Sequence, residues 1–363
     1  MITMQQQSII GWDIGGAHVK AVLLDKNGTI SKVFQQPCPL WQGMGFLKQA
    51  VDFILVELPE NNYKHAITMT GELVDLFDGR DQGVKQIIAA MQDNLAGSEL
   101  FIYAGLNGFL RPDQIQLHHY ASIASANWLA SASLAAGKLK NGLFIDIGST
   151  TTDILVLSDR KVQAIGLTDY ERLISDELVY TGIIRTAVMA VAQSACFKGH
   201  TMGLMAEYFA TMADVYRLTG EMNEDHDQTD TADGAEKSAC ASAKRLSRMT
   251  GYEYSEHDLS LWQLFAKNIK SQQIHKIKRA CERQLSRNLI SDNDFFIGAG
   301  VGRFLVKQIA DELNYPYLDF TELLENEFPV SQLSVADCAP AAAVAILLES
   351  SLIKETVLTG LEQ

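Results

Sequence analysis

A turn rich in hydroxyl groups joins two apolar segments near the middle of the chain, within residues 142–157. The apolar segments are typical of strands, so the pattern predicts a hairpin. The turn consists of Gly148, Ser149, Thr150 and Thr151. Glycine lets successive backbone N–H groups point into one concavity, and the hydroxyls add further donors. With the carboxylates of Asp146 and Asp153 on either side, the turn suits a phosphate and a hydrated divalent cation.

The same pattern occurs near the N-terminus. Asp13 is followed by isoleucine and by Gly15 and Gly16, and an apolar segment follows after His18 and Lys20. An internal repeat of a supersecondary unit is stronger than any single motif. The repeat predicts two similar half-folds that face one another across a cleft and bind phosphates there.

Four segments resemble those of the actin-like ATPase superfamily, which includes sugar kinases, heat-shock chaperones and hydantoinase/oxoprolinase proteins. Residues 13–20 and 146–153 resemble its two phosphate loops. The glycine-rich adenosine-side loop is matched by Gly298, Gly300 and Gly302, after the apolar residues 295–297. Residues 339–345 resemble the small-residue helix that packs the two domains together. The resemblance implies an α/β fold of two actin-like ATPase (ribonuclease H-like) domains with a phosphate-binding cleft between them.

The expected first domain comprises residues 1–135 and 336–363 and contains the first phosphate loop. The expected second domain comprises residues 136–335, with the second phosphate loop, an acidic loop at 221–236 and the glycine-rich loop at 298–302. A chain of 363 residues with 47% hydrophobic residues is long enough for two cores.

The composition narrows the class of protein. A formal charge of −14 argues against nucleic-acid binding, and the partner expected instead is a small phosphorylated molecule. Five widely spaced cysteines without a CxxC pair indicate reduced thiols rather than a zinc site or disulfides. Residues 1–7 do not resemble a signal peptide, and no uncharged apolar run reaches the length of a membrane span. The prediction is a cytoplasmic protein, with a homo-oligomer left open.

Periodicity predicts several secondary-structure elements. Apolar residues at helical spacing predict a helix from residue 45 to 58, and alternation predicts a strand over 65–70 that ends beside Glu72. Residues 121–139 are rich in alanine and serine and predict one helix. The segment that ends at Gly182 is interpreted as a surface helix, or alternatively as a substrate wall.

Two carboxylates are the candidate metal ligands. Asp13 and Asp146 would orient Mg²⁺ through its waters, since Mg²⁺ prefers oxygen ligands and binds together with substrate phosphates. The plainer alternative is that each aspartate only caps its turn. Lys20 is either a phosphate-binding charge or an exposed strand lysine. ATP is a further candidate cofactor.

Four side chains are candidates for acid–base chemistry: Asp13, His18, Glu72 and Asp153. The alternatives are a structural role for His18 and a surface-loop position for Glu72. On the nucleotide or substrate side, Tyr180 could stack on a ligand and Arg185 could bind an anion. The acidic block at 221–236 includes Asp230 and Asp233 and is interpreted as a solvated segment, with a lid or metal-assisting loop as the alternative.

Five motifs together resemble a narrower, hydantoinase-related family. They are the segments at 13–20, 68–73, 146–153, 177–182 and 230–234. That family is linked to tetrahydromethanopterin-dependent one-carbon metabolism, and archaeal members act as the methanofuran-biosynthesis condensing enzyme. The resemblance implies a transferase that joins an aminomethylfuran diphosphate to the phenol of glutamyl-tyramine and releases pyrophosphate. The alternatives are an ATP-dependent kinase or hydantoinase-like hydrolase, and a nucleotide-gated binding module without chemistry.

Overall fold

The computed structural model describes residues 7–59, 62–324 and 333–361. Residues 1–6, expected to be free of a signal peptide, lie outside this description. The chain forms two compact units. The first comprises residues 1–141, 157–169 and 320–363, and the second comprises residues 142–156 and 170–319.

A six-stranded sheet forms the centre of the first unit, in the order β3-β2-β1-β4-β5-β6. Strands β1, β2 and β3 are antiparallel neighbours, whereas β1, β4 and β5 run parallel. The elements of this unit are β1 (Ile9–Ile14), β2 (His18–Leu24), β3 (Ile30–Pro37), α1 (Gly45–Val56), β4 (Lys64–Met69), α2 (Arg80–Asn94), β5 (Glu99–Tyr103), β6 (Phe109–Leu110), α3 (Tyr120–Ile123), α4 (Asn127–Lys138), β9 (Lys161–Val162) and α10 (Ala339–Leu361).

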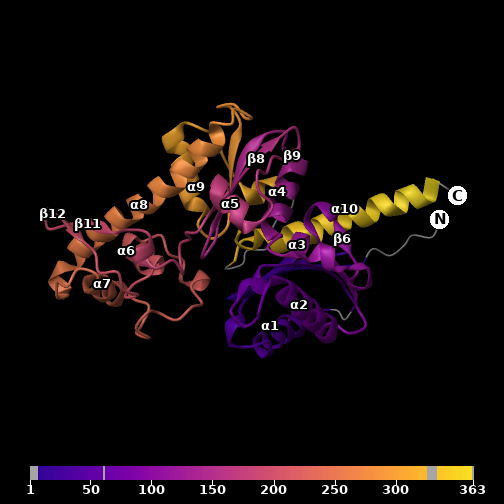
Figure 1. The fold of residues 1–363 in the computed structure, drawn as a ribbon, viewed down its shortest axis with the longest axis horizontal. Coiled ribbons are helices and arrows are strands. Elements are labelled where there is room, and N and C mark those ends of the chain that lie inside the picture. Colours follow the sequence, from indigo (N-terminus) through magenta and orange to yellow (C-terminus); the bar gives the residue numbers. More distant parts are fainter. Residues whose placement is uncertain (1–6, 60–61, 325–332, 362–363) are drawn as a thin grey trace. The chain divides into compact units, whose positions relative to one another are not determined.

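Helices cover both faces of this first sheet (Figure 1). Helices α1 and α2 share a core with alternate strand residues such as Trp12 and Ile14, whereas α10 contacts β1, β2, β4 and α4. The close approach of α10 depends on Gly11, because a Cβ there would overlap the carbonyl of Ala341. The absence of a side chain at Gly11 therefore permits the close packing of α10 on β1 within the first unit.

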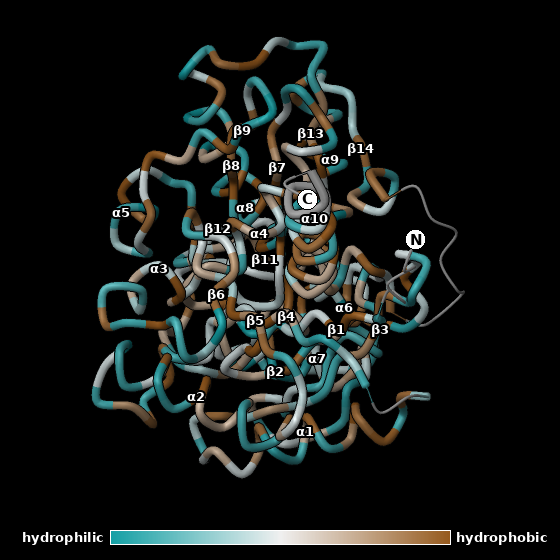
Figure 2. Tube along the Cα trace, turned by 90° about the vertical axis from the view of Figure 1, so that its right-hand side faces the viewer, coloured by the Kyte–Doolittle hydropathy of each residue, from teal (hydrophilic) through white to brown (hydrophobic). Residues whose placement is uncertain are grey.

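The second unit contains a sheet in the order β10-β8-β7-β13-β14, whose central strands are strongly hydrophobic (Figure 2). Its order repeats the β3-β2-β1-β4-β5 order of the first sheet, as the duplicated motif predicts. The elements are β7 (Gly142–Ile147), β8 (Thr152–Ser158), α5 (Asp169–Ser175), β10 (Leu178–Val179), β11 (Ser194–Phe197), β12 (His200–Gly203), α6 (Met212–Thr219), α7 (Ala239–Arg248), α8 (Leu259–Leu285), β13 (Phe295–Ala299), α9 (Arg303–Leu313) and β14 (Tyr317–Asp319). Strand β8 and helix α5 each cross the division between the units.

Two of the helix predictions are wrong in a way that matters for the site. The helix expected over 121–139 is divided into α3 and α4, because Ser125 adopts a positive φ of 50° that an α-helix does not allow. The helix expected to end at Gly182 ends at Ser175 instead, and the chain continues into β10. The expected helix at 45–58 and strand at 65–70 are confirmed as α1 and β4.

Within the described residues, one helical segment, Val335–Thr356, is long and apolar enough to cross a membrane. Its most apolar window is 61% buried inside the structure. Core helices with such burial meet the same criteria of length and composition, and α10 contacts strands of the first sheet.

Candidate active site

The first hairpin loop lies between β1 and β2. The N–H of Gly15 donates to the carbonyl of His18 over 2.9 Å, which closes the turn. A Cβ on Gly16 would lie 2.8 Å from Cγ1 of Val74, so the loop packs tightly. His18, one of the four acid–base candidates, is buried at the start of β2.

Asp13 and Lys20 are direct cross-strand partners at this end of the first sheet. The side chain of Asp13 is buried, and Nζ of Lys20 donates to the carbonyl of Asp337 over 2.6 Å. Lys20 is therefore not the exposed strand lysine of the plainer interpretation. Its ammonium group lies against a backbone oxygen at the turn that precedes α10.

The second hairpin loop lies between β7 and β8. It is closed by a 2.9 Å hydrogen bond from the N–H of Gly148 to the carbonyl of Thr151. The hydroxyls of Ser149 and Thr150 lie 3.4 Å apart and are partly buried. The closed turn agrees with the hairpin that the sequence predicts, and anion binding by its N–H groups and hydroxyls stays a prediction.

The segment after β10 supports the second loop from behind. The N–H of Ile183 donates to the carbonyl of Gly148, and the N–H groups of Ile184 and Arg185 donate to the carbonyl of Ser149. A Cβ on Gly182 would lie 2.6 Å from the carbonyl oxygen of Gly148 and still closer to Thr150. This segment therefore fixes the shape of the loop, which a surface helix at this position could not do.

The glycine-rich loop after β13 packs against Asp146. Gly300 adopts a φ of +79°, and a Cβ on it would overlap Oδ1 of Asp146. The N–H of Gly302 donates to the carbonyl of Ile147 over 2.8 Å. A Cβ on Gly298 would overlap the ring of Tyr317. The three glycines therefore permit close packing around the buried carboxylate of Asp146 and the strand beside it.

Asp153 differs from the other candidate bases because it forms an ion pair. Its Oδ1 lies 2.6 Å from Nη2 of Arg172, whose side chain is buried. The same nitrogen donates to the carbonyl of Glu177. A carboxylate whose charge is matched by a buried guanidinium is a weak acceptor for a phenol proton, so this ion pair disfavours Asp153 as the base.

Glu72 lies in a 3₁₀ turn at the end of β4 and is 1% exposed. Burial raises the pKa of its carboxyl, although the hydrogen bond from Ser125 and the charge of Arg80 oppose that rise. Oγ of Ser125 donates to Oε1 over 2.8 Å, whereas Oε2 has no hydrogen-bond partner among the described residues. Glu72 is thus a buried carboxyl and not the surface-loop carboxylate of the alternative interpretation.

Ser125, Arg80 and Asp169 were not identified by sequence reasoning, although all three act on Glu72. Arg80 forms an ion pair with Asp169, and Oγ of Ser125 lies 3.4 Å from Oδ2 of Asp169. These residues are distant in the sequence and belong to no recognisable motif. The sequence does not single out Ser125 either, because residues 121–139 contain several other serines.

The acidic block at 221–236 is held by basic residues outside it. Arg217 binds Glu224 and Asp227 at 2.7 Å, and Arg245 binds Asp233 at 3.0 Å. Burial raises the pKa of Asp233, but hydrogen bonds from the Ala235 N–H and from Arg245 outweigh it and hold that pKa below its ordinary value. The interpretation as a solvated block is therefore wrong for Asp227, which is buried, whereas Glu224, Asp230 and Asp233 are exposed residues.

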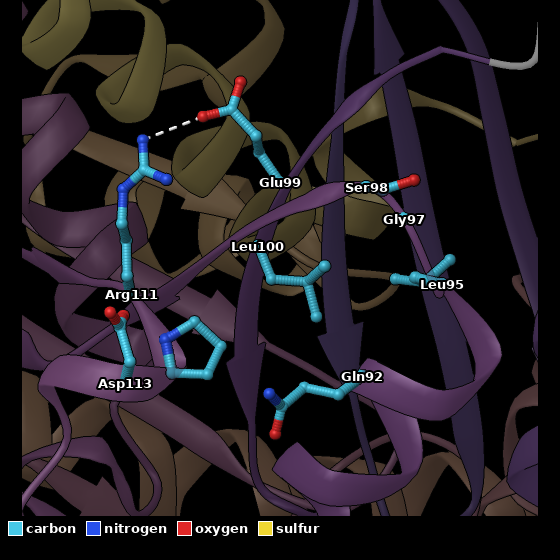
Figure 3. Close-up of a pocket in the computed structure, with 9 residues that line it drawn as sticks. Gln92, Leu95, Gly97, Ser98, Glu99, Leu100, Arg111 and Asp113 are labelled. Carbon is cyan, nitrogen blue, oxygen red and sulfur yellow. Dashed lines mark hydrogen bonds and ion pairs between the residues drawn. The ribbon is translucent and has the colours of Figure 1, made fainter.

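Tyr180 is 63% exposed beside the second loop, and Arg185 is partly buried. A hollow of about 360 Å³ at the edge of the first sheet contains none of the predicted site residues. Arg111 reaches across it to Glu99, with 2.8 Å between Nη2 and Oε2 (Figure 3). Another hollow of about 350 Å³ is lined by Trp128 and by Ala124 and Ala126, which flank Ser125.

The hydantoinase/oxoprolinase family model matches residues 64–342, which is most of the chain. The chain belongs to the hydantoinase/oxoprolinase family. The match includes Glu72, the second hairpin loop and the glycine-rich loop.

Two curated relatives of this family member carry the same name, (4-{4-[2-(gamma-L-glutamylamino)ethyl]phenoxymethyl}furan-2-yl)methanamine synthase. The protein from Methanocaldococcus jannaschii is 28% identical over 349 residues, which cover 95% of this chain and 99% of that one. The protein from Methanococcus vannielii is 26% identical over 223 residues, which cover 59% of this chain and 93% of that one. The narrower resemblance expected from the motifs is confirmed.

A solved structure of ATP-dependent acetone carboxylase in its nucleotide-free form matches 95% of this chain and 70% of that chain, with a TM-score of 0.53 and 9% identity. At this identity the likeness concerns the fold alone. Together with the repeated sheet order, it shows that this hydantoinase/oxoprolinase protein has the two-domain actin-like ATPase fold.

Proposed function

We propose that this protein is a transferase that joins an aminomethylfuran diphosphate to the phenol of glutamyl-tyramine and releases pyrophosphate. The observation that carries the proposal is the match over 349 residues to a synthase whose name describes such an ether. In that name, a phenoxymethyl group links a furan-methanamine to a glutamylaminoethyl side chain. The charged phosphorylated donor does not cross membranes, so the proposal includes a cytoplasmic location.

The first chemical requirement is to stabilise the leaving diphosphate as its carbon–oxygen bond breaks. We assign this role to the two hairpin loops, through Gly15, Gly16 and Lys20 in the first and residues 148–151 in the second. Preorganised backbone N–H groups and hydroxyls stabilise charge where it develops in the transition state. The support for this assignment is the tight closure of both turns and the bracing of the second loop by residues 182–185.

Mg²⁺ is the proposed metal, held by Asp13 and Asp146. Among the described residues, no group of three or more His, Cys, Asp or Glu side chains could hold a metal ion. The two aspartates have the ligand chemistry of a Mg²⁺ site, because Mg²⁺ retains several waters and binds through one or two carboxylates plus substrate phosphates. When bound, it would neutralise charge on the departing diphosphate.

The second requirement is a base for the phenol proton, and we assign it to Glu72. Its carboxyl is buried, its pKa is raised by that burial, and one oxygen has no partner among the described residues. A raised pKa makes the carboxylate a better proton acceptor near neutral pH. His18 is the second candidate, since it is buried beside the first loop.

The remaining predicted residues are assigned to the substrate side of the second unit. Tyr180 is exposed and suits stacking on an aromatic ring, and Arg185 adjoins the second loop. Gly298, Gly300 and Gly302 shape the surroundings of Asp146. Asp230 is exposed, whereas Asp233 is engaged with Arg245.

The test combines the purified protein, the aminomethylfuran diphosphate, glutamyl-tyramine and Mg²⁺. We expect pyrophosphate and the ether in equal amounts, measured by a coupled phosphate assay and by mass spectrometry. An Asp146→Asn variant should lose both products together, and an Asn288→Gly variant on the surface should lose neither. ADP formation from added ATP, without ether, would instead favour the kinase or hydrolase.

A further inference from the structure

A hydroxyl group connects the buried carboxyl of Glu72 to a second carboxylate near the surface. Oγ of Ser125 lies 2.8 Å from Oε1 of Glu72 and 3.4 Å from Oδ2 of Asp169. Glu72 is 1% exposed, whereas the Asp169 side chain is 18% exposed. The three oxygens therefore form a path from the interior of the first unit to solvent.

The backbone conformation of Ser125 is unfavourable in free energy. Ser125 has a φ of +50°, which a residue with a side chain adopts only at some expense of free energy, and it separates α3 from α4. A serine hydroxyl has one donor and two acceptor sites. It can therefore donate to one carboxylate while it accepts a proton from the other.

The elements around Glu72 supply the charges that act on it. Helix α2 contributes Arg80, which forms an ion pair with Asp169 at the start of α5. Helix α2 also approaches closely, since a Cβ on Gly83 would lie 2.8 Å from Cβ of Glu72. A buried carboxyl enclosed in this way has few routes for proton exchange with water.

We infer that Ser125 passes protons between Glu72 and Asp169, and that Asp169 exchanges them with solvent. In the discharge step, the Glu72 carboxyl gives its proton to Oγ of Ser125 while Ser125 gives its own hydroxyl proton to Asp169. The hydroxyl is restored, Glu72 becomes a carboxylate, and Asp169 releases the proton to water. The inference rests on the proposed function only for the source of the proton, namely the phenol.

Ser125 and Asp169 are therefore positioning residues for the base. Ser125 stabilises the ionised form of Glu72 by donating to it, and the negative charge of Asp169 disfavours that form. Removing the Ser125 hydroxyl should therefore raise the pKa of Glu72, and removing the charge of Asp169 should lower it. Residues that only filled space at these two positions would produce neither shift, and the transfer of the proton itself is tested by the rate of exchange.

The test is a ¹³C NMR titration of the full-length protein with labelled glutamate carboxyls, in which the Glu72 signal is assigned by its loss in Glu72→Gln. Ser125→Gly removes the hydroxyl, and glycine favours the positive φ. Asn288→Gly is the matched control, because Asn288 also has a positive φ, of 55°, and lies in the second unit.

We expect one Glu72 signal that moves continuously with pH in the wild type and in Asn288→Gly. In Ser125→Gly the titration should move to higher pH and split into two slowly exchanging signals. In Asp169→Asn it should move to lower pH. A single signal that still moves continuously with pH in Ser125→Gly, shifted or not, would overturn the inference.

This measurement needs no enzymatic activity, so the relay and the proposed reaction can fail independently. If the protein makes the ether, the acid limb of the pH–rate profile should move to higher pH in Ser125→Gly and stay in place in Asn288→Gly. If it makes no ether, the NMR titration still decides whether the relay exists.

Discussion

At the scale of single residues, the environment of Glu72 distinguishes it from the other carboxylates of the site. The carboxylate of Asp153 forms an ion pair with the buried guanidinium of Arg172. Glu72 instead accepts a hydrogen bond from a serine hydroxyl on one carboxyl oxygen, and its other oxygen has no hydrogen-bond partner among the described residues. Burial without a matching charge raises proton affinity. This difference is the physical reason for assigning the phenol proton to Glu72.

Glu72→Gln keeps the size and the hydrogen bond from Ser125 but cannot accept a proton. If Glu72 is the general base, ether formation should fall roughly 10²- to 10⁴-fold, the usual contribution of such a group. Initial rates of pyrophosphate release measure this. Asp153→Asn should instead weaken folding through the loss of the Arg172 ion pair, and equal rates for Glu72→Gln and wild type would refute the role.

Glu72 also predicts a dependence of stability on pH. Because burial raises its folded-state pKa above 4.5, this group stabilises the fold below pH 4.5 and loses that contribution as pH rises through the folded-state pKa. Glu72→Gln should therefore melt at a higher temperature than wild type at pH 8, with a smaller difference at pH 5. Calorimetry at both values checks the sign, and a variant destabilised at pH 8 would contradict it.

At the scale of elements, the two hairpins were predictable because the same acidic and glycine-containing pattern occurs twice, and the structure repeats the sheet order accordingly. The break between α3 and α4 was not predictable. The many alanines favour a continuous helix locally, and the sequence does not reveal the tertiary contacts of Ser125 with Glu72 and Asp169 that accompany its positive φ. The ion pairs of the acidic block were also not predictable, because their basic partners Arg217 and Arg245 lie outside the block in the sequence.

The support of the second loop can be tested at Gly182. Gly182→Ala should reduce the free energy of unfolding by about 1–3 kcal/mol, as overpacking usually does, and should weaken pyrophosphate binding. Gly203→Ala on β12 is the matched control, since a Cβ there meets nothing within 4 Å. Urea unfolding and isothermal titration calorimetry with Mg²⁺ and pyrophosphate give the two quantities. Equal behaviour of both variants would show that the loop does not depend on this contact.

Strands β1 and β4 share a second pH-sensitive contact. Nε1 of Trp12 donates to Nδ1 of His65 over 3.0 Å, and burial lowers the pKa of His65 to about 4. The folded state therefore resists protonation that the unfolded chain accepts near pH 6.5, so stability falls as pH drops from 6.5 toward 4.

His65→Asn retains an acceptor for Trp12 and removes the titrating group. Urea unfolding should show that the wild type loses about 2 kcal/mol more stability than the variant between pH 7 and pH 5, because the unfolded chain binds a proton near pH 6.5 and the folded chain only near pH 4. Identical losses would mean that His65 does not titrate as its burial implies.

At the scale of the whole molecule, a duplicated actin-like fold supplies two hairpin loops, and each unit adds its own specialisation. The first unit contains the Glu72 network, and the second contains the loop braced by residues 182–185. The fold itself does not select a reaction, because it supports many activities. The choice rests on the full-length similarity to the furan-methanamine synthases.

The most direct measurement follows the ether oxygen. Glutamyl-tyramine labelled with ¹⁸O in its phenol is incubated with the purified protein, the aminomethylfuran diphosphate and Mg²⁺, and the products are analysed by mass spectrometry. We predict that the ether retains the label and that one pyrophosphate appears for each ether formed. A furan alcohol carrying oxygen from water, or consumption of the diphosphate with the labelled phenol unchanged, would contradict the account.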